Sequence, residues 1–119
     1  MKLLIWVVLV VVPGFASAQT PACAESPVRF EFQVAARAQW LADSAFAVHP
    51  APAVRNPANL VQFVVDTLGI PLPSTFRVLK AADSTLIAEV RRTFGDWRYT
   101  PAVLDGCRVR QLVQTPVSR

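Results

Sequence analysis

Hydrophobic and polar positions alternate strictly over Val28–Val34. Valine and phenylalanine occupy every second position, and arginine, glutamate and glutamine fill the positions between them. Successive side chains of a β-strand point to opposite faces of a sheet, so strict alternation is typical of a half-buried strand. The pattern therefore predicts a strand over Val28–Val34 with its apolar side chains on one face.

A second apolar region predicts two strands separated by a turn. Leu60–Val65 is rich in β-branched and aromatic residues, which strands favour. Asp66–Pro73 interrupts this run, because its prolines cannot donate to a ladder and its glycine, Gly69, can adopt a positive φ. Thr75–Leu79 resumes the strand-like composition and predicts a second strand.

Apolar positions then recur every fourth residue, at Leu86, Val90 and Phe94. This spacing places them on one face of an α-helix. Asp83 supplies a carboxylate for the helix N-cap, and Gly95 follows the last apolar position as a stop signal. We therefore expect an amphipathic helix from Asp83 to Phe94.

The C-terminal part of the chain predicts a further strand. Trp97–Ala102 opens it, and it continues from Cys107 to Thr115 with a bulge near Gln111, where the alternation is imperfect. Ala35–Val48 remains ambiguous, since its alanines allow a helix and its bulky residues allow short strands.

Together these elements predict an α+β fold. We expect a small antiparallel core sheet of three strands, the Asp83–Phe94 helix packed on one face of it, and an extra N-terminal strand at Val28–Val34. Trp97 and Tyr99 alternate onto one face of their strand. We expect both rings in the core between helix and sheet, with an exposed aromatic contact for a partner as the alternative.

The first residues have the three parts of a secretory signal peptide. Lys2 is followed by the unbroken apolar run Leu3–Val12, and Ala16–Ala18 forms an A-x-A cleavage site. The apolar run is about half as long as a membrane-spanning helix requires, so cleavage after residue 18 is favoured over a retained anchor. We expect export to the periplasm and no membrane span after cleavage. Removing Lys2 lowers the formal net charge from +4 to +3.

Cys23 and Cys107 are the two cysteines of the sequence. Cysteines of an exported chain usually pair, so we expect a Cys23–Cys107 disulfide, with two unpaired thiols as the alternative. We expect no metal site, because His49 is the single histidine and too few ligands remain.

Nothing in the sequence predicts catalysis. His49 lies in a proline-rich connector, and the chain lacks the nucleophile motif G-x-S-x-G and the phosphate-binding motifs G-x-x-x-x-G-K and G-x-G-x-x-G. The aspartates fall at turns and caps, where they serve the backbone. We expect no catalytic residue and no cofactor, and the mild positive charge without a basic run does not predict a nucleic-acid partner.

Residues 59–117 resemble the C-terminal domain of the TonB family of energy transducers. The resemblance rests on Val64-Val65-Asp66 with Gly69, on Val90-Arg91-Arg92 in the helix, on the run Trp97–Ala102, and on Asp105-Gly106 before the last strand. It implies a TonB C-terminal-like domain at 59–119. The signal peptide at 1–18 and an extension at 19–58, with one strand and the connector, precede this domain.

The resemblance implies a non-enzymatic domain that binds an outer-membrane transporter or similar envelope protein by capturing an extended peptide on a sheet edge. The Cys107–Thr115 strand ends the chain, so we expect it to be the free edge. The residues expected to contact the partner are Arg108, Arg110, Leu112 and Val113. This chain lacks the long proline-rich reach and the anchor of a transducer, so partner binding is expected without energy transduction. A structural domain that binds peptidoglycan or self-associates, for example as a homodimer, is the alternative.

Overall fold

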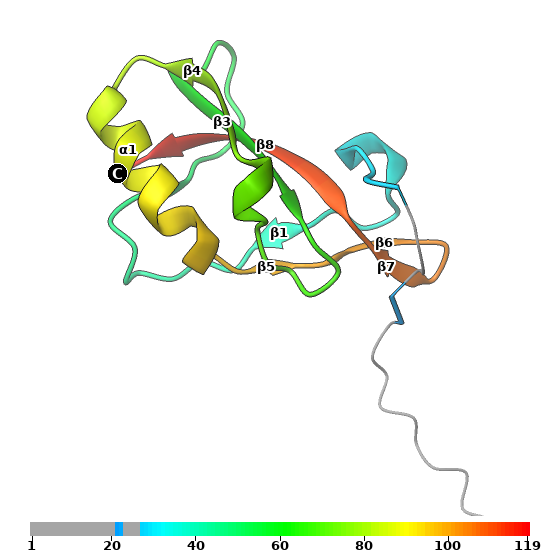
Figure 1. Ribbon diagram of the computed structural model, residues 1–119. Helices are drawn as coiled ribbons and strands as arrows, with labels where there is room; N and C mark the ends of the chain where they lie inside the picture. Colours follow the sequence, from blue (N-terminus) through cyan, green and yellow to red (C-terminus); the bar gives the residue numbers. More distant parts are fainter. Residues whose placement is uncertain (1–20, 23–26) are drawn as a thin grey trace, which may run out of the picture.

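The computed structural model describes residues 21–22 and 27–119 (Figure 1). Its central feature is a four-stranded sheet with the order β2-β8-β3-β4, in which neighbouring strands are antiparallel. The strands are β2 (His49–Pro50), β3 (Asn59–Val65), β4 (Arg77–Ala81) and β8 (Gln111–Ser118). The longest ladder joins β3 to β8, from Leu60 opposite Pro116 to Val65 opposite Gln111.

The single α-helix of the described residues, α1 (Ser84–Thr93), lies along one face of this sheet (Figure 1). The Asp83 side chain accepts a hydrogen bond from the Leu86 backbone N–H at 3.0 Å, so the predicted N-cap is confirmed. The prediction that Gly95 ends the helix is wrong in detail, because α1 already ends at Thr93. The chain tightens into the 3-10 helix η3 (Phe94–Asp96), which contains Gly95.

The core fills the space between α1 and the sheet. Alternate residues of β3 and β8 point toward the helix and are buried, and the residues between them face away from it. Trp97 and Tyr99 belong to this core, which confirms the prediction that they are core residues, and each packs against the Phe63 ring in an edge-on arrangement. The helix-facing members of the two strands are Val61, Phe63, Val65, Val113 and Val117.

Two short ladders flank the main sheet. β1 (Gln39–Trp40) pairs with β5 (Tyr99–Thr100), and β6 (Ala102–Leu104) pairs with β7 (Cys107–Val109). The described residues therefore form an α+β fold of small antiparallel sheets with one main helix packed on them, as predicted. In the ambiguous segment Ala35–Val48, the structure has one two-residue strand, β1, and no helix, and Val48 is buried in the core.

The predicted strand over Val28–Val34 is wrong. Glu31–Gln33 forms the 3-10 helix η1, and the Phe32 side chain is 84% exposed. Gln33 closes the turn locally, because its backbone N–H donates to the Phe30 carbonyl and its side chain accepts from the Phe30 N–H, both at 2.9 Å. Arg29 is the residue of this segment whose backbone pairs with the sheet, through an isolated parallel bridge to Gln111.

Two predicted boundaries also shift. The second strand begins at Arg77 rather than Thr75, because Pro73–Thr75 forms the 3-10 helix η2. The predicted Cys107–Thr115 strand is divided at Arg110 into β7 and β8, and these two strands pair with different partners.

Candidate interaction edge of the sheet

The four residues predicted to contact a partner do not share one surface. Arg108 lies in β7, where its guanidinium donates to the Thr67 carbonyl at 3.1 Å. Arg110 is exposed between the two strands, and its carbonyl accepts from the Arg29 N–H at 2.9 Å. Leu112 is half-buried in β8, and Val113 is buried in the core at 7% exposure.

The prediction that the last strand is a free edge is wrong as stated. β8 lies between β3 on one side and β2 on the other. At its start, Leu112 N–H donates to the Arg29 carbonyl at 2.8 Å. At its end, β2 pairs with Val117 and Ser118, and Ala51 N–H donates to the Pro116 carbonyl at 2.8 Å. Segments that precede β3 in the sequence therefore cover both ends of the outer side of β8.

A short stretch of this outer side lies between the two covered ends. Backbone groups of successive strand residues point alternately to the two neighbouring strands. Leu112 N–H points away from β3, so Val113 N–H points toward β3, and Gln114 N–H and C=O point outward. Gln114 is exposed, and it is the residue of β8 whose backbone faces the gap between Arg29 and β2.

A cleft of about 520 Å³ borders this stretch. Its lining includes Glu31 of η1, Arg37 and the residues up to Trp40, and also β2 with the three residues that follow it. The Trp40 ring stacks on the His49 ring within the lining, with 5.7 Å between centroids. The cleft therefore has an aromatic wall.

The charges around the cleft are largely balanced. Arg37 and Glu31 form an exposed ion pair at 2.6 Å. Tyr99 also lines the cleft, and burial raises the pKa of its hydroxyl.

The other edge of the sheet is β4, and it is poorly suited to accept another strand. The ladder between β3 and β4 has a register shift between Leu60 and Val61, which leaves Leu79 as an extra residue on β4. Arg77 and Lys80 on this strand are exposed. Bulges and positive charges are common protection against edge-to-edge pairing, so the β8 edge is the better candidate.

Sequence reasoning missed Gln114, although one signal pointed to it. Pro116 has no N–H, so inside a paired strand it must sit where the N–H would point away from the ladder. Gln114 lies two residues earlier and has the same orientation, whereas Val113 has the opposite one.

The remaining predictions concern the N-terminal segment and the cysteines. Cys107 begins β7 and has no free thiol. Cys23 and the predicted signal peptide lie outside the described residues, so the Cys23–Cys107 pairing and the cleavage stay predictions. Within the described ranges, no helix has the length and apolar character needed to cross a membrane. In the same part of the chain, no three potential metal-ligating side chains lie together.

No family model matches the chain, and comparisons with curated proteins and with solved structures found no significant match.

Proposed function

We propose that this chain is an exported, non-enzymatic interaction module that binds an extended peptide of a cell-envelope protein along the outer side of β8. An outer-membrane transporter is the kind of partner that the resemblance to the TonB C-terminal domain implies. The observation that carries the proposal is the outward-facing backbone of Gln114, which lies between two covered ends of the same strand and borders a cleft.

Main-chain hydrogen bonding would supply affinity in this mode. A peptide strand in the cleft can accept from Gln114 N–H and donate to the Gln114 and Leu112 carbonyls. Its side chains would alternate between the two faces of the sheet. Those that reach the Trp40 and His49 rings would favour flat or apolar groups at that position.

The covered ends limit how much of a partner can pair. Arg29 and β2 leave room for only a short paired segment, so a longer strand would have to displace β2. β2 consists of only two residues, His49 and Pro50, and the proline has no N–H to donate. Displacement at this end therefore costs fewer main-chain hydrogen bonds than displacement of β3.

Isotope-labelled amide spectra of the mature chain, residues 19–119, test the proposal. The probe is a synthetic peptide from the periplasm-facing N-terminal segment of an outer-membrane transporter. We expect shifts at Leu112–Thr115, with the largest at Gln114. Shifts confined to residues 28–34, with none between Leu112 and Thr115, would contradict the proposed edge.

Three variants separate binding from folding. Gln114→Pro removes the outward N–H, and we expect binding to weaken about tenfold, as loss of one main-chain hydrogen bond predicts, while the fold is retained. Gln114→Ala keeps the N–H and should bind like the original chain. Val113→Pro removes an N–H that faces β3, so it should destabilise the fold itself. Equal binding by Gln114→Pro and Gln114→Ala would exclude main-chain capture at this residue.

Export is a separate part of the proposal and has its own test. N-terminal sequencing of the protein recovered from the periplasm should begin at Gln19. Recovery of an intact Met1 in the membrane fraction would show that the N-terminal segment is retained as an anchor.

A further inference from the structure

The bulge in β4 places two positive charges on one face of the sheet. Arg77 lies opposite Gln62, and Lys80 lies opposite Leu60. In a regular strand, residues three apart point to opposite faces. The extra residue, Leu79, restores the alternation, so Arg77 and Lys80 both lie on the face turned away from α1.

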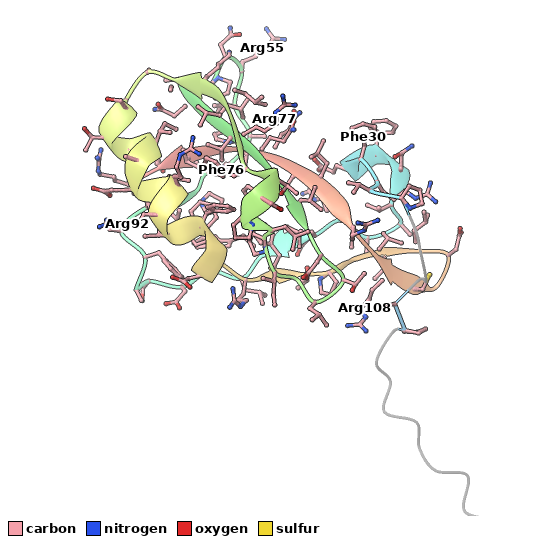
Figure 2. The ribbon with its side chains drawn as sticks, in the orientation of Figure 1. Phe30, Arg55, Phe76, Arg77, Arg92 and Arg108 are labelled. Atoms are coloured by element: carbon pink, nitrogen blue, oxygen red, sulfur yellow. The ribbon has the colours of Figure 1, made fainter. Side chains whose placement is uncertain are left out.

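This open face combines positive charge with an absence of negative charge. The strands β2, β3, β4 and β8 contain no aspartate or glutamate. Arg77 and Lys80 are exposed, and no ion pair of the described residues includes either. Figure 2 shows Arg77 beside β4 in the sheet, whereas Arg92 projects from α1.

Two carboxylates outside these strands are already engaged. Glu31, beside the cleft, pairs with Arg37 at 2.6 Å. Asp83, beyond the end of β4, accepts from Leu86 N–H and pairs with Arg119 at 3.1 Å. The Arg77 and Lys80 charges are therefore left for a ligand outside the chain.

Arg77, Gln62 and Gln114 form a row across the neighbouring strands β4, β3 and β8. Gln62 lies between Arg77 and Gln114, and the Gln114 amide donates to the Gln62 side-chain oxygen at 2.8 Å. This bond leaves Gln62 Nε2 and Gln114 Oε1 for other partners. The next row across the same strands contains Lys80, Leu60 and Pro116, and the last two of these residues are apolar. The face thus offers positive charges, amide donors and acceptors, and a flat apolar strip.

We propose that this open sheet face binds an acidic polysaccharide. Carboxylate groups of such a polymer would pair with Arg77 and Lys80, its hydroxyl groups would bond to the Gln62–Gln114 amides, and the C–H faces of its sugars would lie on Leu60 and Pro116. The charge pattern, the amide row and the flat surface fit this ligand together. The site uses side chains on the face of the sheet, whereas the peptide site uses the backbone edge of β8, and Gln114 is the residue that the two share.

Binding of polygalacturonate to the mature chain, measured by calorimetry at near-physiological salt, tests this proposal. Dextran serves as the neutral comparison. The double variant Arg77→Gln/Lys80→Gln should bind polygalacturonate about tenfold more weakly, as expected from the loss of two exposed ionic contacts. The matched control, Arg91→Gln/Arg92→Gln, removes the same charge from α1 and should bind within about twofold of the original chain, since exposed charges away from the ligand act only weakly through screened solvent.

Further outcomes are equally decisive. Gln62→Ala keeps both charges and should weaken binding severalfold if the amide row contacts the sugar. Equal losses in both double variants would show a non-specific charge effect and overturn the proposal. Binding to phosphatidylglycerol vesicles without binding to polygalacturonate would also overturn it.

Discussion

Gly69 and Tyr99 approach so closely that no side chain fits at residue 69. An ideal Cβ on Gly69 would lie 1.9 Å from the Tyr99 carbonyl oxygen. The Tyr99 N–H donates to the Gly69 carbonyl at 2.9 Å, and Gly69 has a φ of 80°. The turn after β3 is thereby joined to β5, which contains one of the core aromatic residues.

We expect Gly69→Ala to be severely destabilising. The variant combines backbone strain at positive φ with a clash against main chain, and a loss of about 3 kcal/mol or more in the free energy of unfolding is expected. Gly106→Ala is the matched control, because Gly106 has a φ of 76° but no heavy atom within 4 Å of its Cβ position. It should show only the strain, about 1–2 kcal/mol. Similar losses in urea denaturation of both variants would contradict the importance of the Tyr99 contact.

Trp97 should be the most sensitive of the core aromatic residues. Its side chain is fully buried, and its ring lies 6.1 Å from that of Phe63. Trp97→Ala should lower the free energy of unfolding by about 3–5 kcal/mol, the usual range for a large buried ring. Arg98→Ala, at the exposed neighbouring position, serves as the control. A loss below about 1 kcal/mol for Trp97→Ala would be inconsistent with a core ring.

The Asp83 carboxyl should make the stability of the fold depend on pH in the acidic range. The Leu86 N–H and then the Arg119 guanidinium hold its pKa below the ordinary value of 3.8. A carboxyl with a lowered pKa in the folded state stabilises the fold above its unfolded pKa, and this contribution is lost as pH falls through the folded pKa.

Asp83→Asn isolates this contribution, because asparagine still accepts the Leu86 hydrogen bond but carries no charge. The difference in unfolding midpoint between the original chain and this variant should be largest near neutral pH and should shrink as the pH falls below about 4, the ordinary range of this group. Arg119→Gln should remove part of the same difference. A difference that stays constant across this pH range would rule out the carboxyl as its source.

The predicted Cys23–Cys107 disulfide can be tested by mass spectrometry. The non-reduced mature protein should be lighter than the reduced form by two hydrogens, and neither cysteine should react with an alkylating agent. The chain-entropy model gives a stabilisation of about 4–5 kcal/mol for so long a loop, so reduction should lower the unfolding midpoint markedly. Alkylation of both residues without a reductant would disprove the pairing.

Local chemistry was enough to predict several elements from the sequence. The spacing of apolar residues at every fourth position predicted α1, and the carboxylate of Asp83 predicted where the helix begins. Both signals depend on residues within a few positions of one another. The β-branched run predicted β3 within one residue of its observed start. The burial of Trp97 and Tyr99 followed from their alternation and size.

Strand pairing could not be predicted in the same way. The alternation in Val28–Val34 shows a period of two, but a strand also needs a partner for its backbone groups. The outer side of β8 receives only Arg29 from this segment, and Gln33 closes a local turn instead. Alternation alone therefore could not distinguish a paired strand from a short 3-10 helix.

The sequence by itself determined the helix, its cap, the central strand and the aromatic core, because each depends on local periodicity or on the size of apolar side chains. Only the tertiary structure decided which backbone groups of β8 face outward and which charges share the open face. The first depends on Arg29 and β2 pairing with a strand far away in the sequence. The second depends on the bulge at Leu79, which exists only because β4 pairs with β3.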